Sequence, residues 1–181
     1  MTLAVTLDWI FISSKFVALF SLLCFAVVST KTLLFGQPAD NVVEKVEHSL
    51  FVLVAVATVF HFTGRLASDA ILAADMSVMG KRQLYYIFFS VHELLAIAAI
   101  VHFHNRKGCE LAKVTRYICY LSAVSVVLQL LRYADRVVFD TNLLNVIYSQ
   151  GLISLNLFTS MLMLAYPIAR ALRIELNSKW L

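Results

Sequence analysis

Residues 84–103 read LYYIFFSVHELLAIAAIVHF, and this mostly apolar run indicates the fold class. His92 and Glu93 interrupt its apolar sequence. An α-helix rises about 1.5 Å per residue, so about 20 apolar residues are enough to cross the roughly 30 Å hydrocarbon core of a bilayer. The stretch therefore predicts a membrane-spanning helix.

Four more apolar segments surround this stretch. Together the five predict helices at residues 9–34, 47–78, 84–104, 113–139 and 143–173. Hydrophobic residues make up 61% of the 181-residue chain and charged residues 14%, whereas globular proteins have about 45–50% and about 25%. We therefore expect an all-α, polytopic membrane protein in which residues 1–181 form one domain, a bundle of about five transmembrane helices.

The length of the chain limits its function. Five spans need about 105 residues, which leaves no room for a soluble catalytic or nucleic-acid-binding domain. The sequence contains no hydrolase, zinc-protease or phosphate-loop motif, so we expect no enzymatic activity and no catalytic residues. We expect no nucleic-acid partner either, because the basic residues lie at the ends of the segments, as membrane topology requires.

Lysines and arginines near the segment ends predict the orientation, because cytoplasmic loops are enriched in both. One side holds nine of them: Lys31, Lys45, Arg106, Lys107, Lys113, Arg116, Arg170, Arg173 and Lys179. The other side holds six: Lys15, Arg65, Lys81, Arg82, Arg132 and Arg136. The count places the N-terminus outside and the C-terminus in the cytoplasm, and we expect the protein in the plasma (inner) membrane.

The start of the chain carries two further expectations. No basic residue precedes Lys15, so residues 1–14 are not expected to act as a cleaved signal peptide. The ammonium group of Lys15 is expected to reach the lipid headgroups along its flexible stem.

Polar residues recur every three or four positions in three of the segments. Such spacing keeps side chains on one face of a helix, so each segment carries one polar seam. Lipid cannot satisfy these side chains, and they must face each other, a neighbouring subunit or a water-filled cavity. The seams are Thr58, His61, Arg65 and Ser68; Ser122, Ser125, Gln129, Arg132 and Arg136; and Asn142, Asn145, Ser149, Asn156 and Ser160.

Several ionisable side chains fall at similar depths on neighbouring segments. The middle of segment 84–104 lies close to Glu93, and His61 and Arg65 follow the middle of their own segment by about 6 and 12 Å. We expect one polar network in the outer half of the bundle, with Gln129 and Asn156 along it. Its ionisable members are His61, Arg65, Asp69, His92, Glu93, Arg132, Asp135, Arg136 and Asp140.

This network favours an ion or proton pathway. Ionisable groups are costly inside membranes and usually face a cavity or a partner, and histidine exchanges protons near neutral pH. The competing interpretation is a set of closed ion pairs, with Arg65–Asp69 and Arg136–Asp140 at i,i+4 spacing. The leading hypothesis is a channel- or transporter-like subunit that forms a homo-oligomer or assembles with other membrane subunits in the lipid bilayer.

Two alternatives remain open. The first is a non-catalytic structural or partner-binding subunit whose polar seams dock on other helices. The second is an electron-transfer subunit with b-type haem held by His61 and His92, since paired imidazoles ligate haem iron in membrane cytochromes. A second haem is disfavoured, because His48 and His61 point about 140° apart on a helix. We expect no other cofactor and no metal site.

Overall fold

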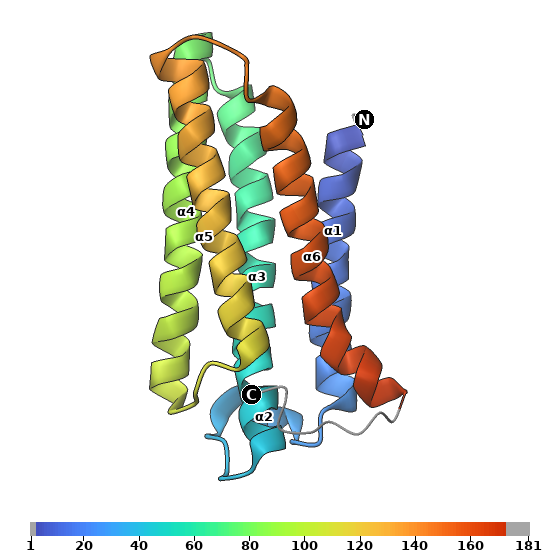
Figure 1. The fold of residues 1–181 in the computed structure, drawn as a ribbon. Coiled ribbons are helices and arrows are strands. Elements are labelled where there is room, and N and C mark those ends of the chain that lie inside the picture. The colour runs from blue at the N-terminus through green and yellow to red at the C-terminus, as the bar shows by residue number, and fades with distance from the viewer. Residues whose placement is uncertain (1–2, 173–181) are drawn as a thin grey trace.

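A computed structural model describes residues 3–172, which fold into helices with no strand among them (Figure 1). Five of the helices are long and apolar enough to cross a membrane. The predicted all-helical fold with five such helices is therefore confirmed for this part of the chain. The elements are α1 (Leu3–Phe25), α2 (Thr30–Phe35), α3 (Val42–Ala73), α4 (Val78–Lys107), α5 (Lys113–Tyr133), the π-helix η1 (Ala134–Val138) and α6 (Asn145–Ala171).

The five long helices form a closed ring. Helix α1 packs on α3 and α6, α4 packs on α3 and α5, and α5 packs on α6. Consecutive long helices run antiparallel, so α1 begins at one end of the bundle and α6 finishes at the other, the end at which α2 also lies (Figure 1). Because every helix has two neighbours in the ring, each turns one face toward a shared interior.

The helix expected over residues 9–34 is broken at residues 26–29, and this prediction is wrong. The carboxylate of Glu47 on α3 accepts hydrogen bonds from the backbone N–H groups of Val27 (2.9 Å) and Val28 (3.0 Å). These bonds replace the helical ones that would continue α1. The sequence around the break is apolar and gives no sign of it, because the residue responsible lies on another helix.

Side-chain caps move two helix starts away from their predicted positions. Helix α3 begins at Val42 and not at residue 47, because Asn41 Oδ1 accepts a hydrogen bond from Val43 N–H (3.0 Å). Helix α4 begins six residues before position 84, because the Ser77 hydroxyl accepts from Gly80 N–H (3.1 Å). Such caps satisfy amide groups that have no partner within the helix.

The segment expected as one helix over residues 113–139 ends in a turn of π-helix. This element places Asp135 so that its carboxylate accepts from the backbone N–H groups of Leu143 (3.1 Å) and Leu144 (3.3 Å) and from the Thr141 hydroxyl. The side chain therefore closes the connection between α5 and α6, and α6 begins at Asn145.

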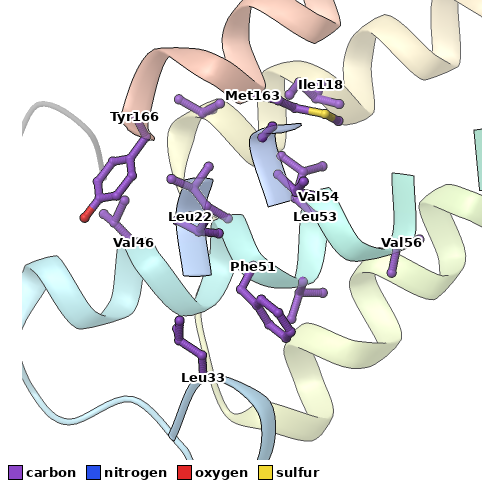
Figure 2. Close-up of a cluster of buried hydrophobic side chains, with 14 of the residues drawn as sticks. Leu22, Leu33, Val46, Phe51, Leu53, Val54, Val56, Ile118, Met163 and Tyr166 are labelled. Carbon is purple, nitrogen blue, oxygen red and sulfur yellow. The ribbon is translucent and has the colours of Figure 1, made fainter. Parts of the chain in front are cut away.

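An apolar core fills the half of the bundle nearer α2. Figure 2 shows Leu22, Leu53, Val54, Ile118 and Met163 from four helices meeting there. All five side chains are buried. The core closes the interior of the ring at this level.

A polar cluster lies beyond the core, at the end where α4 meets α5. His104 Nδ1–H donates to the carbonyl of Ile100 (2.7 Å), so His104 Nε2 is the acceptor for the Ser49 hydroxyl (2.9 Å). The Ser49 oxygen in turn accepts from Ala112 N–H (3.0 Å) and the Thr115 hydroxyl (2.8 Å). One buried serine thus joins α3, α4 and the start of α5.

Candidate functional site

A cavity of about 510 Å³ lies inside the ring, lined by all five long helices. Its lining reaches Val5 and Leu72, in the terminal turns of α1 and α3 at the end of the bundle away from α2. Its opposite end is formed by Ile100, Ile118 and Met163, which belong to or adjoin the apolar core. The cavity therefore occupies one half of the bundle.

Charged side chains line the cavity from α1 and α3. Lys15 is only 5% exposed, and its ammonium group contacts Nδ1 of His61. The expected position of Lys15 at the headgroups is therefore wrong, because the side chain finds its partner within the bundle. His61 Nε2 bonds to Asp8 Oδ1 (2.9 Å). Asp8 and Lys15 were missed as site residues, although their spacing of seven places both on one face of α1.

The donors and acceptors in this group define the state of the imidazole. A lysine ammonium carries donors only, so His61 Nδ1 must be the acceptor in its contact with Lys15. The ring proton then lies on Nε2 and is donated to Asp8. His61 is therefore a neutral link between a cation and a carboxylate.

Arg65 extends the charged group toward the end of the cavity. Its guanidinium lies 3.5 Å from Asp8 Oδ2 and also pairs with Asp69, one turn further along α3. The Arg65–Asp69 pair considered from the sequence is thus present. Arg65 lines the cavity, and Asp69 is exposed beside it.

Glu93 approaches the same lysine from α4. Its carboxyl group interacts electrostatically with Lys15 and bonds to the Ser122 hydroxyl on α5. Acidic and basic groups therefore follow one another across the cavity; those from Lys15 to Asp69 are in contact, and Glu93 acts on Lys15 through its charge. In order, they are Glu93, Lys15, His61, Asp8, Arg65 and Asp69.

The side chain of His92 has different contacts from that of its neighbour Glu93. Its imidazole stacks on Phe88 with centroids 5.3 Å apart, and its Nε2 lies 3.3 Å from the hydroxyl oxygen of Thr63. A Cβ at Gly64 would lie 3.3 Å from His92 Cε1, so this glycine makes room for the imidazole.

The haem hypothesis needs a free nitrogen on His61 as well as on His92. Both nitrogens of His61 already have partners, Lys15 and Asp8. The arrangement is therefore not that of a haem ligand pair. Among the described residues, no three His, Cys, Asp or Glu side chains are grouped closely enough to hold a metal ion.

The wall of the cavity formed by α5 and α6 carries neutral polar groups. The Tyr148 hydroxyl donates to Gln129 Oε1 (2.9 Å), which leaves Gln129 Nε2 as a donor. Asn156 Nδ2 donates to the carbonyl of Leu152 (3.1 Å), which leaves Asn156 Oδ1 as an acceptor. Hydroxyl groups complete this wall: Ser122, Ser125, Ser149 and Thr159.

The remaining predicted site residues form a separate cluster at the connection between α5 and α6. Arg132 pairs with Asp135 and donates to the side-chain oxygens of Asn142 (2.7 Å) and Asn145 (2.9 Å). None of these groups lines the cavity. The single network expected from the sequence is therefore divided in two.

The predicted ion pair between Arg136 and Asp140 is wrong. Arg136 donates to the carbonyl of Thr141 (3.1 Å), and Asp140 pairs with Arg82 (3.3 Å). The helix ends before Asp140, whose φ of 47° is left-handed, so the i,i+4 geometry on which the prediction relied is absent.

The cavity thus combines a charged wall with a neutral hydrogen-bonding wall. Of the predicted residues, those that line it are His61, Arg65, His92, Glu93, Gln129 and Asn156. Alternating acids and bases at hydrogen-bond distance can pass a proton from one to the next. Comparisons of the chain with protein-family models, curated proteins and solved structures found no match.

Proposed function

We propose that the chain is an integral membrane protein whose helices enclose a one-sided pathway for protons. The observation that carries the proposal is the buried Lys15, held between His61 and Glu93 in a cavity of about 510 Å³. A lysine buried inside an apolar bundle is costly and marks a functional position more often than a structural one.

Insertion in a membrane is supported by the outer surface of the ring. Large apolar side chains are exposed on all five long helices; Phe20 is 70% exposed and Ile147 61%. A soluble monomer rarely leaves so much contiguous apolar surface in contact with water. Lipid is the environment that matches these outer faces.

Protons are favoured over larger ions by the nature of the charged wall. Lys15, His61 and Asp8 are proton donors and acceptors in direct contact, and the carboxyl group of Glu93 interacts electrostatically with Lys15. At about 30 Å³ per molecule, the cavity also has room for about 17 waters. Water in the cavity would connect this series to the end of the bundle.

The closed end of the cavity favours a transporter-like protein over an open channel. Between Glu93 and the α2 end of the bundle, the interior is filled by the apolar core around Leu53 and Met163. A proton at the closed end must wait for this core to part before it reaches the other side. We therefore expect slow, carrier-like turnover.

The docking alternative has less support. The polar seams that would bind a partner helix are turned toward the interior of the ring, as shown by the cavity-lining positions of His61, Ser122, Gln129 and Asn156. One chain thus encloses these polar side chains itself, and the pathway does not require a second subunit to complete it.

The test is proton movement in liposomes. Protein is reconstituted into vesicles that contain a pH-sensitive dye, and a potassium gradient with valinomycin drives protons inward. We expect the wild type to acidify the interior faster than protein-free vesicles do. Lys15→Met and Glu93→Gln are each expected to slow the rate by about tenfold or more.

Matched controls carry the same chemical changes at exposed positions. Lys31→Met on α2 and Glu110→Gln in the α4–α5 connection remove one charge each from outside the cavity. Both are expected to retain the wild-type rate. A wild type that moves protons no faster than empty vesicles would refute the proposal, and so would unchanged rates in both cavity variants.

A further inference from the structure

The cavity is larger than a proton pathway requires. A file of waters a few molecules long would connect Lys15 to the end of the bundle, yet the volume is about 510 Å³. This value falls in the range of about 300–1,000 Å³ that is typical of small-molecule sites. The cavity therefore has room for a small organic molecule as well as for water.

The charged groups of the cavity are already matched to one another. Lys15 contacts His61 and faces Glu93, while Arg65 is paired with Asp8. Two positive and two negative groups therefore line the cavity with no net formal charge. A charged solute would lose part of its hydration in this narrow cavity without gaining a free counter-charge, which is unfavourable.

The unmatched hydrogen-bonding capacity belongs to two neutral amides and to one N–H group of Arg65. Gln129 is only 4% exposed, and its Nε2 is not used in the bond to Tyr148. Asn156 Oδ1 is not used in the bond to Leu152. The buried Nε of Arg65 also lacks a partner and can donate to a neutral oxygen. Hydroxyl groups fit such a mixture, because each is both donor and acceptor.

Aromatic rings complete the lining on α3 and α4. Phe60, Tyr85 and Phe89 line the cavity together with the polar groups. Ring faces of this kind pack against the apolar face of a sugar or a flat heterocycle. Small-molecule sites commonly combine such apolar contacts with a few well-placed polar groups.

We infer that the cavity binds an uncharged, hydroxyl-bearing organic solute, of monosaccharide to nucleoside size, against its α5–α6 wall. The inference rests on the proposed function, since it takes the proton pathway and the solute site to share one cavity. Gln129 and Asn156 hold the hydroxyl groups, and the series from Glu93 to Asp8 supplies the protons that would drive uptake.

Equilibrium binding to the purified, detergent-solubilised protein tests this inference. The probes are tritiated glucose, myo-inositol, ribose and uridine, and the charged comparison compounds are gluconate, glucosamine and glucose 6-phosphate. We expect at least one neutral probe to bind. Its charged analogues are expected to displace it poorly. Gln129→Leu and Asn156→Leu are each expected to weaken binding by about tenfold, because one or two hydrogen bonds are lost.

The matched control is Gln150→Leu, the same substitution at an exposed position of α6. It is expected to bind like the wild type, and thermal unfolding of all three variants checks that they fold. The inference would be overturned if no neutral probe bound, or if a charged compound bound more tightly than the neutral ones. It would also be overturned if Gln129→Leu and Asn156→Leu bound the probe as tightly as the wild type does.

The two proposals fail separately. Solute binding without proton movement in liposomes would refute the proton pathway and leave the solute site in place. Proton movement by a protein that binds none of the neutral probes would refute the solute site and leave the pathway in place.

Discussion

The carboxylate of Glu47 accepts three hydrogen bonds in a side chain that is fully buried. Two come from the backbone N–H groups of Val27 and Val28, and the third comes from the Tyr166 hydroxyl (2.7 Å). A buried charge is tolerated when hydrogen bonds satisfy its lone pairs. Glu47 therefore holds together the break after α1, helix α3 and helix α6.

Glu47→Gln is expected to destabilise the protein by about 1–3 kcal/mol, because the amide nitrogen cannot accept and one buried N–H group loses its partner. The measurement is unfolding of the detergent-solubilised protein by heat or denaturant. Tyr166→Phe keeps both backbone hydrogen bonds to Glu47, and it is expected to lower the free energy of unfolding by less, about 1 kcal/mol.

Glu110→Gln serves as the control for Glu47→Gln, since Glu110 is exposed. Its stability is expected to remain within about 0.5 kcal/mol of the wild type. If Glu47→Gln were as stable as this control, the carboxylate would not be what maintains the break in α1.

Helix association at the α2 end depends on Ser49. Its hydroxyl bonds to His104 on α4, to Thr115 on α5 and to the N–H of Ala112, which precedes α5. Helix α5 has no side-chain cap of its own, so Ser49 supplies from α3 an acceptor for one amide at its start. Because this capping group belongs to another helix, the start of α5 is satisfied only when α3 and α5 are packed together.

Ser49→Ala is expected to lower the free energy of unfolding by at least about 2 kcal/mol, because several buried polar groups lose their partner at once. Ser154→Ala, at an exposed position of α6, is the matched control and is expected to change it by less than about 0.5 kcal/mol. Equal unfolding curves for the two variants would show that the Ser49 bonds do not stabilise the ring.

Charge at the two ends of the ring predicts its orientation. Among the described residues, the α2 end carries seven lysines and arginines: Lys31, Lys45, Arg106, Lys107, Lys113, Arg116 and Arg170. The opposite end, where the cavity lies, carries fewer lysines and arginines outside the interior of the ring, and Lys81 and Arg82 are among them. By the positive-inside rule, the α2 end should face the cytoplasm and the cavity should face outward.

Labelling of introduced cysteines in intact cells measures this orientation. Gln83→Cys is expected to react with a membrane-impermeant maleimide in intact cells, and Glu110→Cys only after permeabilisation. Both are made in a variant with Cys24→Ser, since Cys24 is exposed. Cys109 is buried, and burial raises the pKa of its thiol, so it reacts slowly. The opposite labelling pattern would reverse the proposed topology.

The positions of Lys15 and Glu93 show how far the site could be predicted. Glu93 was recognised because a carboxyl group in the middle of an apolar segment is conspicuous along the chain. Lys15 was assigned to the headgroups, since a lysine near one end of a segment can extend in either direction. Its partner His61 is 46 residues away, and no local pattern connects the two.

The order of the amino acids is sufficient to predict the five long apolar helices, the polar seams along three of them and the greater positive charge at one end. These properties follow from hydropathy and helical periodicity, which act over a few neighbouring residues. The packed structure was needed to reveal that the helices close into a ring, that α1 is broken and that the ionisable residues divide between a cavity and a turn. Those outcomes depend on pairs such as Glu47–Tyr166, 119 residues apart, and are set by how whole helices pack.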